Sequence, residues 1–316
     1  CMDQKLYQNV IDYINSKIMS EELIVGDFIP SESQLSKLLN VSIGTVRKAI
    51  DKLENSNTLR RYHGKGTCVQ SKLIAIKNDF KNERINLAAA FRWAARLNMH
   101  EAVANHFSLA VSKDGSKFLL NPIGIHFSKI CASDLILVDS NDKSTMSKPN
   151  APDPTAWAIH GALHRNNPQA RCILHAHPKY ATILSCLDDK TMKPIDQNTM
   201  RFYEKVSIDY EYNGMGLGKE AERLSTILGD NSVMLMGNHG VLTAANTVAK
   251  AFDDLFYYER SCETLIGAYQ TGKKIHQVSH EIATKTAAQW QKYDASDMHF
   301  DALKRILDQE EADYKN

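Results

Sequence analysis

The sequence predicts a chain of two parts, a small winged helix-turn-helix domain followed by a larger domain of α/β layers. A length of 316 residues suits two domains at roughly 100–200 residues each. Short helical patterns and one hairpin pattern fill the first seventy residues, whereas strands and helices alternate irregularly in the remainder. We expect domains at residues 1–70 and 84–316, joined by a polar, lysine-containing linker at 71–83.

The composition is that of an ordinary globular protein, with 43% apolar and 24% charged residues. No stretch approaches the roughly 18 apolar residues of a membrane helix, and the first residues lack the layout of a signal peptide. Six cysteines are scattered without CxxC pairs, so neither a disulfide framework nor a cysteine-rich zinc site is predicted. We expect a cytoplasmic protein with reduced thiols and no membrane contact.

The N-terminal seventy residues contain the signals of a helix-turn-helix. Apolar residues recur at helical spacing over residues 5–18, which predicts a first helix. Ser31 and Ser42 stand at N-cap positions before QLSKLL and GTVRKAIDKL, and residues 39–41 form the turn between these two helices.

A hairpin and a local excess of basic residues follow. Strand patterns at 59–62 and 67–69 flank the turn sequence HGKG, which predicts a wing. Between residues 47 and 65 there are six basic side chains and two acidic ones. The alternative to a DNA-binding face is a solvated charged surface, but a recognition helix and a wing would place these residues against bases and phosphates. We expect DNA contacts from Ser42, Thr45, Arg47, Lys48, His63, Gly64 and Lys65.

The remainder of the chain predicts an antiparallel meander followed by alternating helices and strands. A helix is expected at residues 85–97, and the meander at FSLAVS, KFLLNP and DLILVDS. Helix PTAWAIHGALHRNN then leads into the buried strand ARCILHAH and helix KYATILSCL. Strand SVMLMGNHG precedes a long helix over about residues 247–271.

Three histidines stand at the ends of predicted strands. His175 and His177 are two residues apart, so they project from the same face and can converge on one ion. His239, at the end of another strand, is the natural third ligand of a divalent metal. A structural or surface pair is the alternative for two histidines at this spacing.

The N-terminal segment closely resembles the winged-helix DNA-binding domain of GntR-type bacterial transcription regulators. The matching strings are GDFIPSESQLSKLLNVSIGTVRKAIDKLE and the wing RRYHGKGTCV. Members of that family usually carry an arginine directly after the serine that starts the recognition helix. This sequence has Ile43 there, so the resemblance implies that one base-reading contact is missing.

Residues 84–316 resemble the class II aldolase/adducin superfamily, and in particular its adducin-like bacterial branch. The resemblance implies a three-layer α/β/α domain around a mostly antiparallel sheet, usually a ring-like homotetramer with active sites between subunits. It also implies a divalent metal, zinc first and manganese second, held by His175, His177 and His239. The matching strings are ANHFSLAV, FLLNPIGIHFSKICASDLILVDSND, AIHGALHRNNPQARCILHAHPKYA, LMGNHGVLTAANTV and AFDDLFYYERSCETLIGAY.

The sequence departs from the sugar-phosphate aldolases of this family at their catalytic glutamate, which lies nineteen residues before the first metal histidine. Ala156 occupies that position. Asn105 and Gly124 match positions that line the substrate pocket. The threonine and serine phosphate contacts are replaced by Ile123 and by residues 153–154, which disfavours a sugar phosphate as the substrate.

Two functions remain open. One is a metal-dependent lyase for a small hydroxy or keto compound, fused to a DNA-binding domain; decarboxylation needs only an electron sink, whereas aldol cleavage also needs a base. The other is a transcription regulator whose aldolase-like domain senses a metabolite without turnover. A purely structural adducin-like module explains the metal ligands less well. Candidate bases are His160, His164, Tyr203 and Tyr210, for which helix packing and core or interface positions are the alternatives.

Overall fold

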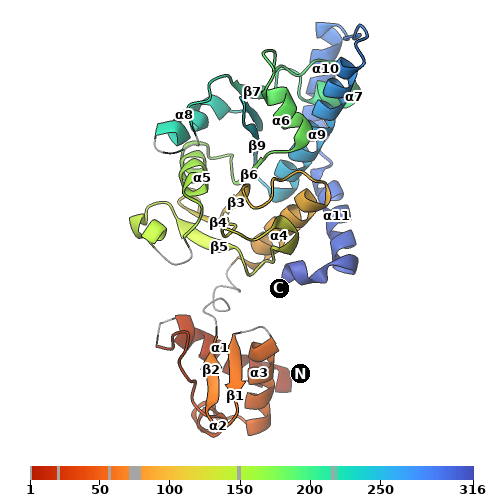
Figure 1. Ribbon diagram of the computed structural model, residues 1–316. Coiled ribbons are helices and arrows are strands. Elements are labelled where there is room, and N and C mark those ends of the chain that lie inside the picture. Colours follow the sequence, from red (N-terminus) through yellow and green to blue (C-terminus); the bar gives the residue numbers. More distant parts are fainter. Residues whose placement is uncertain are drawn as a thin grey trace. The chain divides into compact units, whose positions relative to one another are not determined.

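The computed structural model of the chain describes residues 2–19, 22–55, 58–70, 80–147, 151–214, 217 and 219–316. Its contacts divide the chain into two compact units, Cys1–Lys81 and Asn82–Asn316 (Figure 1). Most of the predicted linker, residues 71–79, lies outside the described residues. None of the helices in the described part of the chain has both the length and the apolar character needed to cross a membrane.

The first unit is a winged helix-turn-helix, as predicted. Ser31 caps α2 by accepting a hydrogen bond from the backbone of Gln34, and Ser42 Oγ accepts one from the backbone of Thr45 at 3.1 Å. Both predicted N-caps are therefore confirmed. The elements are α1 (Met2–Met19), α2 (Glu32–Leu39), α3 (Ile43–Asn55) and the antiparallel strands β1 (Leu59–Tyr62) and β2 (Gly66–Val69).

A seven-stranded sheet forms the centre of the second unit. Its strand order is β5-β4-β3-β6-β9-β8-β7, and every neighbouring pair is antiparallel except β7 and β8. The predicted meander corresponds to β3, β4 and β5, whereas β7 and β9 were not predicted. The strands are β3 (His106–Ala110), β4 (Lys117–Leu120), β5 (Ile136–Asp139), β6 (Cys172–Ala176), β7 (Val206–Asp209), β8 (Val233–Met236) and β9 (Gly240–Ala245).

Helices cover both faces of this sheet, which confirms the three-layer α/β/α architecture. α5 and α8 pack on one face, against buried side chains such as Ile173, Met234 and Leu242. α6 and α9 contact the other face, where Thr243 Oγ1 of β9 donates to the carbonyl of Ala251 at 3.0 Å. The helices are α4 (Lys81–Arg96), α5 (Pro154–Asn166), α6 (Lys179–Ser185), α7 (Gln197–Arg201), α8 (Lys219–Leu228), α9 (Val248–Gln270), α10 (His280–Lys292) and α11 (Ser296–Glu310).

The helix expected from residue 85 begins at Lys81, because the polar residues that read as linker form its first turn.

Candidate metal centre

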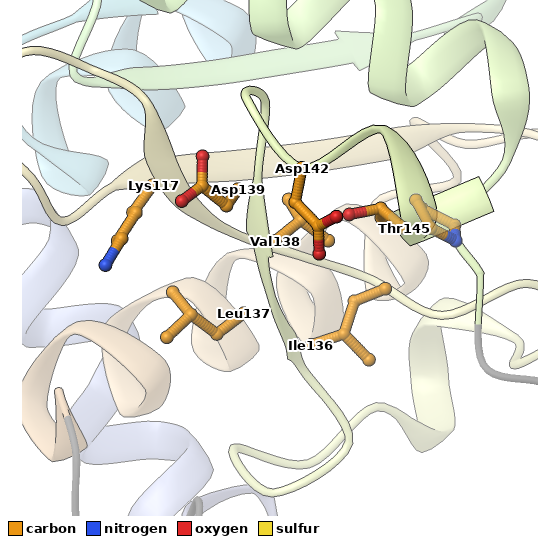
Figure 2. Close-up of a pocket in the computed structure, with 8 residues that line it drawn as sticks. Lys117, Ile136, Leu137, Val138, Asp139, Asp142 and Thr145 are labelled. Atoms are coloured by element: carbon orange, nitrogen blue, oxygen red, sulfur yellow. The ribbon is translucent and has the colours of Figure 1, made fainter. Parts of the chain in front are cut away.

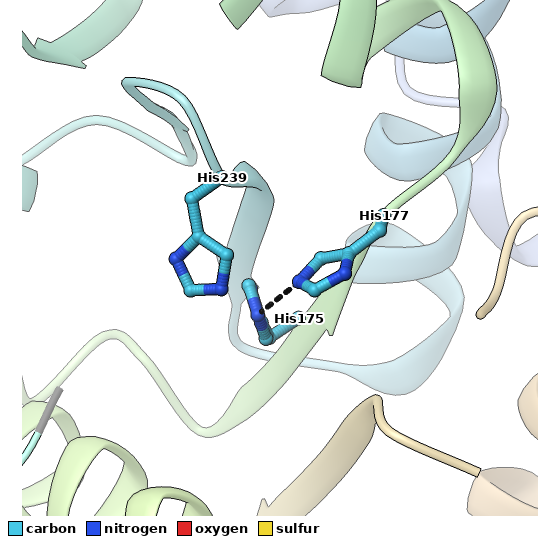
Figure 3. A group of neighbouring side chains, drawn as sticks. All are labelled: His175, His177 and His239. Carbon is cyan, nitrogen blue, oxygen red and sulfur yellow. Dashed lines mark hydrogen bonds between the residues drawn. The ribbon is translucent and has the colours of Figure 1, made fainter. Parts of the chain in front are cut away.

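Strand pairing brings the three predicted metal histidines together. His175 lies at the end of β6, His177 directly follows this strand, and His239 occupies the turn between β8 and β9. β6 and β9 pair antiparallel with Ala176 opposite Val241, so the turn before β9 lies beside the end of β6. One ligand atom from each imidazole lies within 4.8 Å of the others (Figure 3).

The hydrogen bonds around two of these rings fix where their protons lie. His175 Nδ1 is 3.1 Å from the carbonyl oxygen of Val241, and His177 Nδ1 is 2.8 Å from Oε2 of Glu101. A carbonyl or carboxylate oxygen only accepts, so each ring carries its proton on Nδ1 and a lone pair on Nε2. When both rings are neutral, their unprotonated nitrogens therefore face each other.

These two Nε2 atoms are 3.1 Å apart, the contact dashed in Figure 3. A hydrogen bond there would need a second proton on one ring, and burial holds the pKa of His175 well below its ordinary value. Two lone pairs at this distance repel each other, and a cation bound between them relieves the repulsion. The spacing is close to the roughly 3.3 Å between two imidazoles on one tetrahedral zinc, given Zn–N bonds of about 2.05 Å. The donor set therefore fits a divalent metal.

Burial keeps the cluster in its metal-binding form. It lowers the pKa of His239 to about 4, and the neighbouring His177 adds to this effect. Metal binding requires neutral imidazole, so no proton has to leave His175 or His239 at neutral pH.

Asn105, predicted to bind substrate, supports the loop that carries His177. Its Oδ1 accepts from the backbone N–H of Glu101 at 2.7 Å and from that of His177 at 3.3 Å. Its Nδ2 is buried without a hydrogen-bond partner. Asn105 also lines a cavity of about 30 Å³. His106, Asp153 and Ala156 line the same cavity, so an unused donor lies where the family glutamate would stand.

Gly124, the other predicted substrate residue, follows Ile123 at the edge of this cavity. Its φ of +81° is in the left-handed region, which glycine adopts without steric cost. The glycine therefore sets the course of this loop through its backbone.

A buried array of histidines runs from β3 into α5. His106 Nδ1 contacts His160 Nε2 at 2.6 Å, and Ser108 Oγ contacts both His160 Nδ1 and, at 2.8 Å, His164 Nε2. The array ends where His164 Nδ1 meets the carbonyl of Ala170 at 2.6 Å. That carbonyl only accepts, so the neutral groups must all donate in one direction, and His106 Nε2 remains without a proton.

This array shows the surroundings of His160 and His164, which were predicted as candidate bases. His160 is fully buried, and both of its ring nitrogens are already hydrogen-bonded. His164 is likewise bonded at both nitrogens. Their contacts are with His106 and Ser108 of β3, whereas the alternative weighed from sequence was helix packing against the metal strand.

The predicted tyrosines lie differently. Tyr203 Oη contacts His280 Nδ1 of α10 at 3.1 Å, and its described contacts include none with the three metal histidines. Tyr210 is 61% exposed. Tyr212, which sequence reasoning did not single out, stands edge-on to His239 with ring centroids 6.3 Å apart. Only its position two residues after Tyr210 could have suggested it.

Four of the predicted DNA-binding residues line a cleft between α2, α3 and the wing. They are Arg47, His63, Gly64 and Lys65, and the cleft has a volume of about 850 Å³. Ser42, directly before α3, and Lys48, on α3, are exposed.

Two corrections apply to this face. Thr45 is buried and contacts Ser42 Oγ through its hydroxyl at 2.8 Å, so it stabilises the start of α3 and does not face solvent. Arg47 pairs with Glu32 at 2.7 Å, and Arg61 pairs with carboxylates of its own domain. Part of the local basic charge is therefore neutralised internally.

A further cavity of about 240 Å³ lies beside the edge strand β5 (Figure 2). Apolar side chains of the strand and the polar groups of Lys117, Asp139 and Asp142 line it. Its lining includes none of the predicted site residues, so it is separate from the metal centre.

Comparison with known proteins identifies both parts of the chain. Residues 85–266 match the family model of the class II aldolase and adducin N-terminal domain, and residues 6–69 match that of the bacterial regulatory proteins of the gntR family. The chain belongs to the class II aldolase/adducin family and carries an N-terminal GntR-type domain.

Individual relatives resemble the aldolase-like part. A Pseudomonas aeruginosa protein named for the class 2 aldolases is 30% identical over 200 residues, which are 63% of this chain and 76% of the relative. The decarboxylase NovR of Streptomyces niveus is 26% identical over 204 residues, 64% of this chain and 75% of the relative. The crystal structure of an aldolase II superfamily protein from Pseudomonas syringae superposes with a TM-score of 0.69 at 30% identity, covering 76% of this chain and 97% of that one.

Proposed function

We propose that the aldolase-like domain is a metal-dependent lyase that acts on a small hydroxy or keto compound. The observation that carries this proposal is the pair of unprotonated Nε2 atoms of His175 and His177, 3.1 Å apart. His239 completes the ligand set, and zinc is the proposed ion, with manganese second. When bound, such an ion would polarise a carbonyl group of the substrate and stabilise the enolate left on it when a neighbouring carbon–carbon bond breaks.

Decarboxylation fits the surrounding residues better than aldol cleavage. Aldol cleavage needs a group that removes a hydroxyl proton, and Ala156 offers a methyl group at the position of the family glutamate. His160 is enclosed in the buried array. Asn105 Nδ2 can donate to a substrate oxygen in the small cavity. The name of the Streptomyces niveus relative, a decarboxylase, supports the same reaction class.

The test combines metal analysis with turnover. We expect about one zinc per unaltered chain by elemental mass spectrometry and a large loss of metal in His175→Ala and His239→Ala. Small keto acids, hydroxy-keto acids among them, should release CO₂ with the unaltered chain and not with these variants. A folded chain that takes up no divalent metal would overturn the proposal.

The second candidate function is transcription regulation, with the aldolase-like domain as a metabolite sensor. The exposed cleft between α3 and the wing, lined by Arg47, His63 and Lys65, favours DNA binding. A labelled fragment of DNA from upstream of its own coding sequence should bind at nanomolar protein and dissociate as salt rises, because phosphate contacts dominate affinity. Absence of binding at low salt would contradict this function. Full metal loading without turnover of any substrate tested would favour the sensor over the lyase.

A further inference from the structure

We infer that Glu101 is a positioning residue of the metal centre, which fixes the proton and the direction of His177 and thereby sets metal affinity. This inference rests on the proposed metal site. Glu101 Oε2 lies 2.8 Å from His177 Nδ1, on the side of the ring opposite the nitrogen that faces the cluster. A proton held on Nδ1 by the carboxylate leaves Nε2 free to bind a cation.

The two histidines of the β6 end have different partners behind them. Behind His175 is the neutral backbone carbonyl of Val241, which no side-chain substitution removes. Behind His177 is a carboxylate, and a hydrogen bond to a charged acceptor is shorter and stronger than one between neutral groups. Such a partner also raises the basicity of the imidazole as a ligand. A substitution of Glu101 should therefore change the affinity of the site for a metal ion.

The position of Glu101 is itself fixed. Its backbone N–H and that of His177 donate to the same oxygen, Oδ1 of Asn105. This shared acceptor holds the two backbone segments in register although they are far apart in the sequence. The loop that carries the Glu101 carboxylate is therefore held beside the segment that carries His177.

Stability of the fold does not account for this contact. The Glu101 side chain is 66% exposed, whereas that of His177 is 18% exposed. Ion pairs at such exposed positions contribute little to folding, because water screens the attraction and the side chain loses freedom. Loss of an outer-shell partner of a metal histidine, in contrast, typically weakens metal binding by about 10- to 100-fold.

The experiment measures Co²⁺ binding to the metal-free full chain by competition with a chelator, together with the visible absorption of the bound ion. The variants are Glu101→Ala and Glu101→Gln, and the matched control is Glu281→Gln, which removes an exposed carboxylate on α10. We expect binding weaker by about 10- to 100-fold in Glu101→Ala, a smaller loss in Glu101→Gln, and a changed absorption spectrum in both. The melting temperature of each metal-free variant should equal that of the unaltered chain.

The outcomes separate the two proposals. Failure of the unaltered chain to bind Co²⁺ overturns the metal site and the role of Glu101 with it. Tight binding by the unaltered chain, with equal affinity and spectrum in both Glu101 variants, overturns the role of Glu101 alone. A matching loss of stability in the metal-free variants would also overturn it, because Glu101 would then act on the fold.

Discussion

At the scale of single residues, Ser108 occupies the most constrained position in the buried array. Its hydroxyl accepts from His160 and donates to His164, and no other described side chain lies between these two rings in the array. Ser108 itself is fully buried in β3. The Ser108 oxygen therefore links the two halves of the array, and the direction of the hydrogen bonds in one half sets their direction in the other.

Replacing Ser108 by alanine should destabilise the second unit. The change leaves one buried donor and one buried acceptor without partners, and each such group costs about 1–3 kcal/mol. Urea denaturation of the metal-free chain measures the loss. Thr284→Ala, which removes an exposed hydroxyl from α10, is the control and should change little. Unchanged stability in Ser108→Ala would show that the array is not ordered as described.

A second prediction concerns Glu32, which pairs with Arg47 in the DNA-binding unit. Glu32→Gln removes this competitor for the guanidinium, so Arg47 becomes available to a DNA phosphate. We expect tighter DNA binding and a salt dependence steeper by about one unit of slope, because one more phosphate is neutralised. Binding at several salt concentrations provides the measurement, with Arg47→Ala as the opposite change. Weaker binding in Glu32→Gln would show that Glu32 instead orients Arg47 for the DNA.

The sequence predicted that His175, His177 and His239 gather, but it did not predict their surroundings. The two-residue spacing of His175 and His177 survives in the structure because a strand end fixes the directions of side chains locally. Glu101 and His106 were not singled out. Their proximity to the ligands depends on the loop before β3 and on the pairing of β3 with β6, which no local pattern encodes.

At the scale of secondary structure elements, β9 was missed because its small apolar residues run directly into the long helix α9. Its first residue, Gly240, has a structural reason to be glycine. A Cβ there would lie 2.6 Å from the carbonyl oxygen of Ala176 and 2.7 Å from Cδ2 of His177. The absence of a side chain allows β9 to approach Ala176 and His177 closely.

Gly240→Ala should therefore weaken metal binding. The added methyl group would displace either the backbone of β6 or the ring of His177, since neither can yield at those distances. We expect weaker Co²⁺ binding and a lower melting temperature. Gly267→Ala on α9, where no atom lies within 4 Å of the new methyl group, is the control and should bind metal normally. Normal binding by Gly240→Ala would mean that the two strands can separate without disturbing the centre.

At the scale of the whole molecule, the buried histidines predict how stability depends on pH. Burial lowers the pKa of His164 to about 3 and that of His106 to about 4, against an ordinary value of 6.5. In the unfolded chain these groups take up protons as the pH falls below about 6.5, whereas the folded chain excludes them. The contribution of these neutral groups is complete above pH 6.5 and is lost as the pH falls toward 4.

Thermal melting of the metal-free chain between pH 7.5 and 5 tests this sign. We expect the melting temperature to fall steadily below about pH 6.5, before most carboxylates begin to titrate. A flat profile over this range would show that the histidines remain accessible to protons in the folded state.

For the oligomeric state of the protein, we propose the homotetramer that the family resemblance implies. Large side chains remain exposed after β7: Tyr210 is 61% exposed, Tyr212, which contacts His239, 54% and Leu217 55%. Exposed apolar groups gathered beside a site commonly mark an interface. Sedimentation should give four times the chain mass of 35.5 kDa, and Tyr210→Glu should reduce it. A monomer at micromolar concentration would contradict the proposal.

The small cavity beside Ala156 has a consequence for any attempt to place a base there. Its volume of about 30 Å³ suits a water molecule or two, and its lining includes the acidic residue Asp153. A carboxyl group introduced at position 156 would share this space with an acidic neighbour, and two carboxyl groups that share a site do not both ionise freely.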